Sequence, residues 1–110
     1  CLELGVPLIH SAGAQFRGQV LLVRRGGPCL RCLLPEPPDA ETDECRVPGV
    51  FGPAVGVVAA LAAAEALRVL GGDSARRELL LADLASGRIR RAALAALPGC
   101  KCGDSAPVLP

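Results

Sequence analysis

The chain has 110 residues, the size of one domain or of part of one. Apolar residues make up 51% of it and charged residues 21%, a composition that excludes a disordered chain as the default. Its 12 basic and 11 acidic residues leave a net charge of +1, and aromatic residues are only 2%. A basic footprint and a base-stacking platform are therefore both missing, so we expect no nucleic acid as a partner.

Two short apolar runs near the N-terminus, residues 7–14 and 19–24, are expected to form strands. Glycines flank the second run on both sides, as is typical of strand ends. Because the apolar character of the runs is continuous, we expect a sheet covered on both faces, as in an α/β protein. His10, the only histidine, lies inside the first run, where a core or strand-end histidine is more common than a catalytic base.

A long irregular segment follows at 25–49, with five prolines and an acidic stretch at 36–44. Loops of this length in compact domains are usually functional or disordered. The sequence therefore predicts either a functional loop or a segment without fixed structure between the second strand and the next regular element.

The longest regular element is a helix expected at 50–70. Pro53 suits the first helical turn, and Gly71 begins a glycine pair that ends the helix. The run is nearly long enough to cross a bilayer. However, Pro53 near one end and Glu65 and Arg68 near the other favour a helix buried in a sheet protein, so we expect no membrane partner.

A β-hairpin is expected from residues 78–84 and 88–94, joined by a turn at 85–87 that contains glycine. The second of these strands sets three arginines against apolar residues, so we expect it to be partly exposed. The tail beyond carries two cysteines, and residues 104–110 are expected to be disordered.

Four of the six cysteines form two close pairs, Cys29 with Cys32 and Cys100 with Cys102. The turn in a CxxC pair aims both sulfurs at one point, so the two pairs together can hold one zinc ion and staple the loop to the tail. Disulfides and a redox CxxC are the alternatives. The high apolar content and the lack of a signal peptide favour a cytoplasmic protein with a metal site over disulfides. Residues 33–35, Leu-Leu-Pro, are a poor helix start, whereas a redox CxxC usually opens a helix.

Motifs that would indicate catalysis are absent from the sequence. It contains no Ser–His–Asp order, no HExxH and no GxxxxGK[ST]. From the residues alone, the chain is therefore part of an α/β protein with a zinc clip and shows no catalytic site.

Five sequence blocks in a fixed order add a family resemblance. They are GVPLIHSAGAQFRGQV, GPCLRCLLPEPP, ECRVPGVFGPAVGVVAALAAAEALRVLGG, ELLLADLASGRIR and PGCKCG. Together they resemble the C-terminal half of the ThiF/MoeB/HesA family, the prokaryotic relatives of the ubiquitin-activating enzymes. The resemblance covers residues 1–103, essentially the whole chain.

The resemblance implies an adenylyltransferase that binds ATP and magnesium on a Rossmann-like parallel sheet. In this reaction, a carboxylate oxygen of the C-terminal Gly-Gly of a ubiquitin-fold sulfur-carrier protein, of thiamine or molybdopterin type, attacks the α-phosphorus and pyrophosphate leaves. The resemblance also implies a homodimer with one structural zinc per subunit, held by cysteine pairs that match Cys29/Cys32 and Cys100/Cys102. Cys45 matches a position that is a reactive thiol in several members, able to form an acyl-disulfide or thioester with the carrier.

The family's Gly-rich nucleotide loop, its ATP-binding Arg and Lys and its magnesium-binding Asp all lie N-terminal to the region present here. We therefore expect a C-terminal half-domain at 1–103 that meets ATP and magnesium only in a full-length parent. Two further departures are the CxC spacing of the second cysteine pair, which is usually CxxC, and an alanine where the family has a glutamine in the long helix. The alternative to an enzyme part is a catalytically inactive, zinc-stapled interaction module or fragment.

Overall fold

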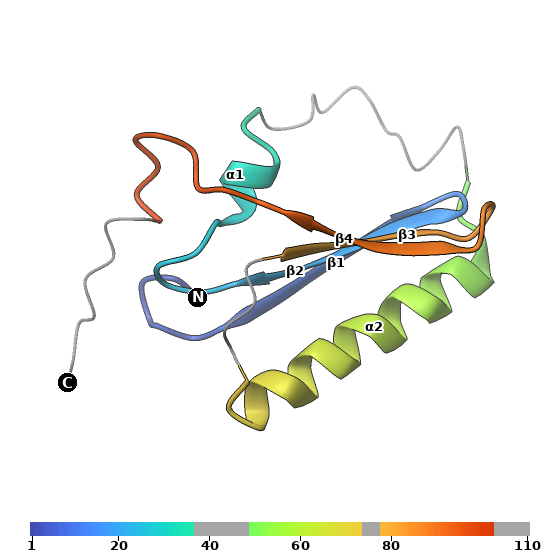
Figure 1. Cartoon of the computed structure of the whole chain (residues 1–110), viewed down its shortest axis with the longest axis horizontal. Coiled ribbons are helices and arrows are strands. Elements are labelled where there is room, and N and C mark those ends of the chain that lie inside the picture. The colour runs from blue at the N-terminus through green and yellow to red at the C-terminus, as the bar shows by residue number, and fades with distance from the viewer. Residues whose placement is uncertain (37–48, 74–77, 103–110) are drawn as a thin grey trace.

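The computed structural model describes residues 1–36, 49–73 and 78–102. Over these residues the chain is an α/β structure with one four-stranded antiparallel sheet, in the order β1-β2-β3-β4. A long helix lies along one face of the sheet, and a short helix and the C-terminal segment lie on the other side (Figure 1). The elements are β1 (Leu8–Ala14), β2 (Arg17–Val23), α1 (Leu30–Leu33), α2 (Gly52–Leu70), β3 (Glu78–Asp83) and β4 (Arg88–Ala93).

The first two strands form a hairpin whose turn also anchors the start of α2. Ala14 pairs with Arg17 across a two-residue turn, in which Gln15 adopts a left-handed φ of 53°. The Gln15 backbone bonds to both sides of the chain that enters α2: its N–H donates to Gly49 O at 3.3 Å, and its O accepts from Phe51 N–H at 3.4 Å. The Phe16 and Phe51 rings pack with centroids 4.6 Å apart. These contacts fix where α2 begins relative to the sheet.

The two faces of the sheet pack against different partners because successive side chains of a strand point to opposite faces. On one face, Val20 of β2 and Leu80 of β3 form a buried cluster with Val58 of α2. On the other face, Leu21 and Leu79 belong to a second buried cluster that includes cysteines from α1 and the tail. The core thus consists of two thin layers, one on each side of the sheet.

The expected strands and hairpin are present, but the first strand is not covered as predicted. The four central and final residues of β2 are buried, whereas five of the seven residues of β1 are exposed. β1 is an edge strand of the described sheet, and it receives cover mainly from α2 on one face. Short turns join β1 to β2 and β3 to β4, so these two pairs are antiparallel. β2 and β3 are also antiparallel, although the long connection between them contains α1 and α2.

The long helix occupies Gly52–Leu70, close to the expected 50–70, but the prediction that it is buried is wrong. Only Ala54, Val58 and Glu65 are buried in it, and Leu67 and Leu70 are largely exposed. The reason is that α2 rests on the sheet along one side, while no described element covers its outer side. The helix α2 is long and apolar enough to cross a membrane. Core helices of soluble proteins meet the same criteria of length and composition.

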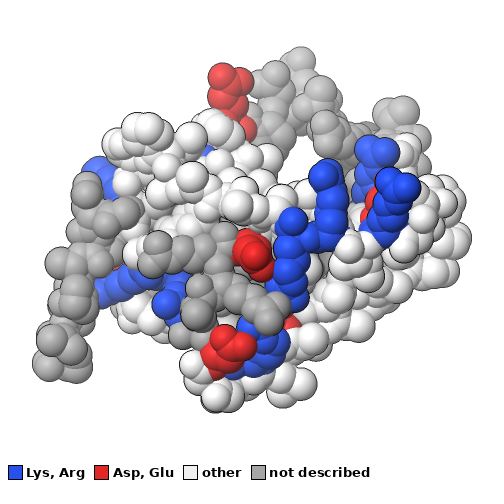
Figure 2. Space-filling view, in the orientation of Figure 1, with Lys and Arg blue, Asp and Glu red and all other residues white. Residues whose placement is uncertain are grey.

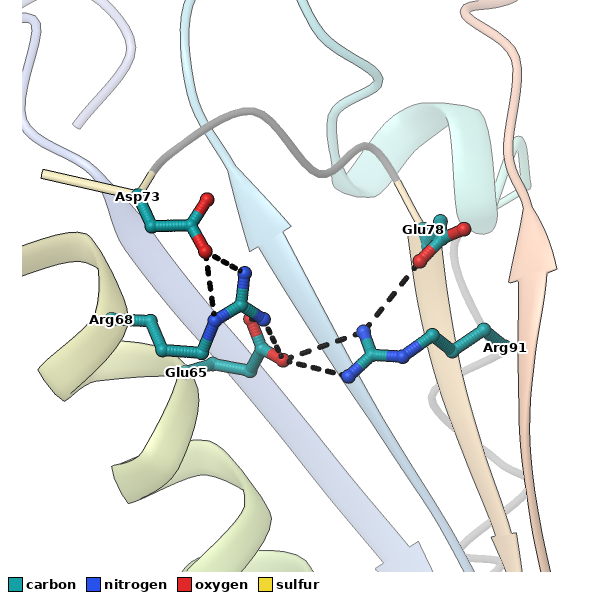
Figure 3. A network of polar contacts seen from close by, with 5 residues as sticks. All are labelled: Glu65, Arg68, Asp73, Glu78 and Arg91. Carbon is teal, nitrogen blue, oxygen red and sulfur yellow. Dashed lines mark hydrogen bonds and ion pairs between the residues drawn. The ribbon is translucent and has the colours of Figure 1, made fainter.

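A network of charged side chains ties the C-terminal half of α2 to the last two strands (Figure 3). At its centre is Glu65, whose side chain is only 10% exposed. Its carboxylate accepts from Arg68 one helical turn away at 3.1 Å and from Arg91 of β4 at 3.5 Å. Arg91 also reaches Glu78 of β3 at 3.6 Å, and Arg68 reaches Asp73 at 2.6 Å. The strand that was expected to be partly exposed is β4. It places Arg91 on the face of the sheet that α2 covers, where Arg91 reaches Glu65.

Candidate metal centre

Two turns bring the cysteine pairs together at one end of the sheet. Cys29 caps the four-residue helix α1 and accepts from Cys32 N–H through its carbonyl at 3.0 Å, so one tight turn joins the first pair. In the tail, Cys100 N–H donates to Leu97 O at 3.0 Å and forms a similar turn before the second pair. A direct bond links the two turns, since Leu97 N–H donates to Cys32 Sγ at 3.3 Å.

The four sulfurs are arranged as a metal site requires. All four Sγ atoms lie within 4.8 Å of one another. The distances are 3.8 Å from Cys29 to Cys32, 3.6 Å from Cys29 to Cys100 and 3.5 Å from Cys32 to Cys102. A tetrahedral zinc with Zn–S bonds of about 2.3 Å holds its sulfurs about 3.8 Å apart. The CxC spacing of the second pair therefore still allows four sulfurs to surround one ion.

Burial and hydrogen bonds set unequal proton affinities in this cluster. For Cys32, burial favours the neutral thiol, but bonds with the backbone of Leu97 and Cys29 and with neighbouring cysteines outweigh it and lower the pKa to about 7. For Cys102, burial and hydrogen bonds to the other cysteines raise the pKa to about 12. Without a cation, Cys32 thus gives up its proton more readily than Cys102 does. A divalent cation would be needed to hold four thiolates in so small a space.

The cluster also belongs to the hydrophobic core. Cys29, Cys32 and Cys102 are buried together with Leu21 and Leu79 of the sheet. Partly buried residues pack around them, namely Leu2, Leu33, Leu81, Leu94 and Cys100. The cysteines therefore replace the side chains that a larger hydrophobic core would supply between α1, the tail and the sheet.

Among the described residues, neither Cys1 nor His10 belongs to this centre. Cys45 lies outside the described residues, as does the tail at 104–110. Cys1 is exposed. His10 is partly buried, and its Nε2 atom has no hydrogen-bond partner in the described part of the chain, so it forms no catalytic pair there.

The sequence analysis assigned no separate role to the arginines of the last strand. In the structure they divide between the two faces of the sheet: Arg91 joins Glu65 under α2, whereas Arg88 and Arg90 line a groove on the opposite face. The alternation of side chains along a strand could have predicted this division, because residues 88 and 90 lie on one face of the sheet and residue 91 lies on the other.

Comparison with known proteins assigns the chain to a family. The model of the ThiF family matches residues 1–103. The chain is 39% identical to the sulfur carrier protein ThiS adenylyltransferase of Escherichia coli over 96% of its length and 43% of that protein. It is 40% identical to the sulfur carrier protein adenylyltransferase of Thermus thermophilus, covering 92% of this chain and 41% of that protein.

A longer relative is the adenylyltransferase and sulfurtransferase MOCS3 of Sus scrofa, which is 39% identical over 94% of this chain and 24% of its own length. The chain thus spans between a quarter and about two fifths of these relatives. Its order of strand pair, cysteine turn, long helix, hairpin and second cysteine turn falls within the matched region. The chain belongs to the ThiF family.

Proposed function

We propose that this chain is part of an ATP-dependent adenylyltransferase that activates the C-terminal Gly-Gly carboxylate of a ubiquitin-fold sulfur-carrier protein of thiamine or molybdopterin type. The observation that carries the proposal is the ThiF match over residues 1–103, together with relatives whose names state sulfur-carrier adenylylation. In the proposed reaction a carboxylate oxygen of the carrier attacks the α-phosphorus of ATP, pyrophosphate leaves, and a carrier acyl-adenylate forms.

The part that this chain would play is to complete the sheet and to hold the carrier, not to bind the phosphates. Its sequence lacks a Gly-rich phosphate loop, and the relatives extend well beyond the region that it matches. The free edge of β1 supports this proposal, because an edge strand presents unpaired backbone groups that another strand can pair with. A Rossmann-like parallel sheet in the rest of a full-length parent, with ATP and magnesium bound there, would use that edge.

Zinc is the metal that the four-cysteine centre fits. Four thiolate-forming ligands at tetrahedral separations are typical of a structural zinc site, in which no position is open to substrate. Cys29, Cys32, Cys100 and Cys102 would hold the ion and fasten α1 to the tail. A redox role for the first pair is less well supported, because Cys29 and Cys32 each lie near a cysteine of the second pair.

Further features of the proposal come from the family resemblance, from the sequence and from the exposed side of α2. Cys45 would be the thiol that attaches the carrier after adenylation: its sulfur attacks the acyl carbon of the acyl-adenylate, a thioester forms and AMP leaves. The enzyme would be a cytoplasmic homodimer. The exposed apolar residues on the outer side of α2, such as Leu67 and Leu70, are consistent with additional protein covering this helix in the complete enzyme.

A second candidate is a zinc-stapled interaction module without catalysis. The observation that favours it is that the cysteine centre is complete within this chain, so it can form whether or not a nucleotide site is attached. The two candidates differ in one measurable property: only the adenylyltransferase would catalyse a reaction of ATP that depends on the carrier.

The test is ATP–pyrophosphate exchange by the full-length parent protein, measured with carriers of the thiamine and the molybdopterin type. We expect exchange with one of these carriers and no exchange with the same carrier lacking its terminal Gly-Gly. If neither carrier supports exchange although the protein is folded and loaded with zinc, the adenylyltransferase proposal is wrong and the interaction module is favoured.

A further inference from the structure

Solvent reaches the four sulfurs of the cysteine centre unequally. Cys29, Cys32 and Cys102 are buried, with 3–6% of each residue exposed, whereas Cys100 is only partly buried. The residues just before Cys100, at 95–99, are exposed. In Figure 2, mainly uncharged side chains surround the place where Figure 1 shows α1. A small neutral molecule in solution therefore meets the centre first at Cys100.

Two close sulfur contacts join one cysteine turn to the other. Cys29 Sγ lies 3.6 Å from Cys100 Sγ, and Cys32 Sγ lies 3.5 Å from Cys102 Sγ. Within the first turn, the Cys29 and Cys32 sulfurs are farther apart, at 3.8 Å. Four cysteines can pair in three ways. Pairing between the turns uses both close contacts, whereas pairing within the turns would also need a strained link across the single residue of the CxC pair.

We propose that the cysteine centre is an oxidative modification site, at which hydrogen peroxide converts the four thiols into two disulfides, Cys29–Cys100 and Cys32–Cys102. The Cys100 sulfur attacks one oxygen of the peroxide, the O–O bond breaks, and a sulfenic acid and water form. The Cys29 sulfur then attacks the Cys100 sulfur, an S–S bond forms and the hydroxyl group leaves as water. Two sulfurs thus lose two electrons, and one peroxide is reduced to two waters.

The second disulfide forms in the same way and consumes a second peroxide. It follows the first because Cys32 and Cys102 are both buried, and Cys29 is no longer available to either of them. The accessible cysteine and its close neighbour therefore set the pairing of all four.

Oxidation would remove the ligands of the metal but keep α1 fastened to the tail. Thiolates bind metals, and a disulfide leaves none, so zinc bound as proposed above would be released. The disulfides would still join the two turns beside Leu21 and Leu79. They would also restrict the unfolded chain, because the linked cysteines are 71 and 70 residues apart. The inference does not depend on adenylyltransferase activity, and only the release of zinc rests on the proposed metal.

The pairing can be read directly from peptides. Trypsin cleaves after Arg31 and after Lys101, which lie between the two members of each cysteine pair. A second digest after Glu41 separates Cys32 from Cys45. Full-length parent protein, purified with zinc under reducing conditions, is freed of reductant, titrated with hydrogen peroxide, blocked with iodoacetamide and digested. Mass spectrometry quantifies the linked peptides, and a chromogenic chelator measures the zinc released.

We expect the Cys29–Cys100 link at low peroxide and the Cys32–Cys102 link at higher peroxide. A Cys29–Cys32 link should be at least tenfold less abundant than either. Zinc should appear in solution as the first link forms, and dithiothreitol with added zinc should reverse both changes. The fully linked protein should still melt cooperatively. Cys1→Ser, which changes a cysteine outside the centre, is the matched control and should leave the pattern unchanged.

A second variant tests the order of the steps. Cys29→Ser removes the sulfur that resolves the first intermediate, so Cys100 should accumulate as a sulfenic acid that dimedone labels. Labelling mainly at Cys32 or Cys102 would contradict entry at Cys100.

Three results with the wild-type protein would overturn the inference. One is links within the turns as the main products. Another is full alkylation of all four cysteines of the centre at a peroxide concentration that already oxidises Cys1. The third is formation of both expected links with loss of the cooperative melt, since the disulfides would then not keep α1 in place. Reduced protein that holds no zinc would refute the release of zinc, while its peptides would test the pairing as before.

Discussion

Gly18 of β2 lies directly beneath Val58 of α2, so close that a Cβ atom at position 18 would be 2.1 Å from Val58 Cγ2. The same Cβ would approach the carbonyl oxygen of Ala12 to 3.2 Å. Glycine is therefore required here by the close approach of the helix to the sheet. We expect Gly18→Ala to destabilise the protein by about 2 kcal/mol, because the clash forces α2 away from its cluster with Val20 and Leu80.

The same contact supplies its own control. Shortening the helix residue in the double variant Gly18→Ala with Val58→Ala removes the clash, so it should recover part of the lost stability relative to the sum of the single variants. Urea unfolding of the four proteins gives the coupling free energy directly. Simple additivity of the two single effects would show that the helix does not rest on Gly18.

A second prediction concerns Glu65, the nearly buried carboxylate that joins Arg68 to Arg91. Glu65→Gln keeps the shape but removes the charge, and we expect a loss of about 1–3 kcal/mol in the free energy of unfolding, as for hydrogen bonds to charged groups. Arg17→Gln, which breaks the exposed pair with Asp83, should cost at most about 1 kcal/mol. Equal losses in denaturant unfolding would mean that the α2 network is only a surface feature.

Local patterns predicted the elements well, because each depends on a short stretch of chain. Gly26 after residues 19–24, Pro53 and Gly71 at the helix ends, and the glycine-containing turn at 85–87 set boundaries close to those observed. Gly18 does not mark a strand end, because it lies inside β2. The sequence could also predict that the two cysteine turns come together, because each cysteine pair is a local motif. This holds even though Cys32 and Cys102 are 70 residues apart.

What the patterns could not supply is which faces are covered. The apolar helix at 52–70 resembles a buried helix whether or not a partner is present, and only tertiary structure shows Leu67 exposed. The apolar run at 8–14 likewise does not reveal that it is an edge strand. The groove escaped prediction for a related reason: Arg88 lies in one cross-strand row with Asp83 and Arg17 only because of the strand registers.

The third prediction is that the protein binds one zinc ion through the four cysteines of the candidate centre. Elemental analysis of protein purified under reducing conditions without chelator should find zinc at one equivalent, and Cys100→Ser with Cys102→Ser should abolish it. Removing a ligand held at a thousand times its Kd costs about 4 kcal/mol, so a chelator should lower the melting temperature clearly. Absence of zinc, or a native Cys29–Cys32 disulfide, would contradict the assignment.

The fourth prediction is that the 110-residue chain by itself neither binds ATP tightly nor catalyses pyrophosphate exchange. Phosphoryl chemistry depends on positioning and on charge stabilisation around the phosphates, and the sequence carries no Gly-rich phosphate loop. Isothermal titration with Mg-ATP should show no saturable binding, and the exchange assay with carrier should stay at background. Full-length parent protein is the positive control, and exchange by the isolated chain would show that its nucleotide site lies within these residues.

The last prediction concerns Cys45, which the sequence places beside acidic Asp43 and Glu44 and basic Arg46. The acidic neighbours raise the pKa of a thiol, whereas Arg46 and the positive N-terminal end of the downstream helix lower it. Once zinc protects the four clustered cysteines, we expect Cys45 to react with iodoacetamide faster than Cys1, as peptide mass spectrometry can measure. In the full-length parent, Cys45→Ala should leave carrier adenylation within about twofold of wild type and impair later sulfur transfer or covalent carrier attachment at least tenfold, with Cys1→Ala as the control. Loss of adenylation itself, or normal downstream transfer, would show that Cys45 does not act after the acyl-adenylate.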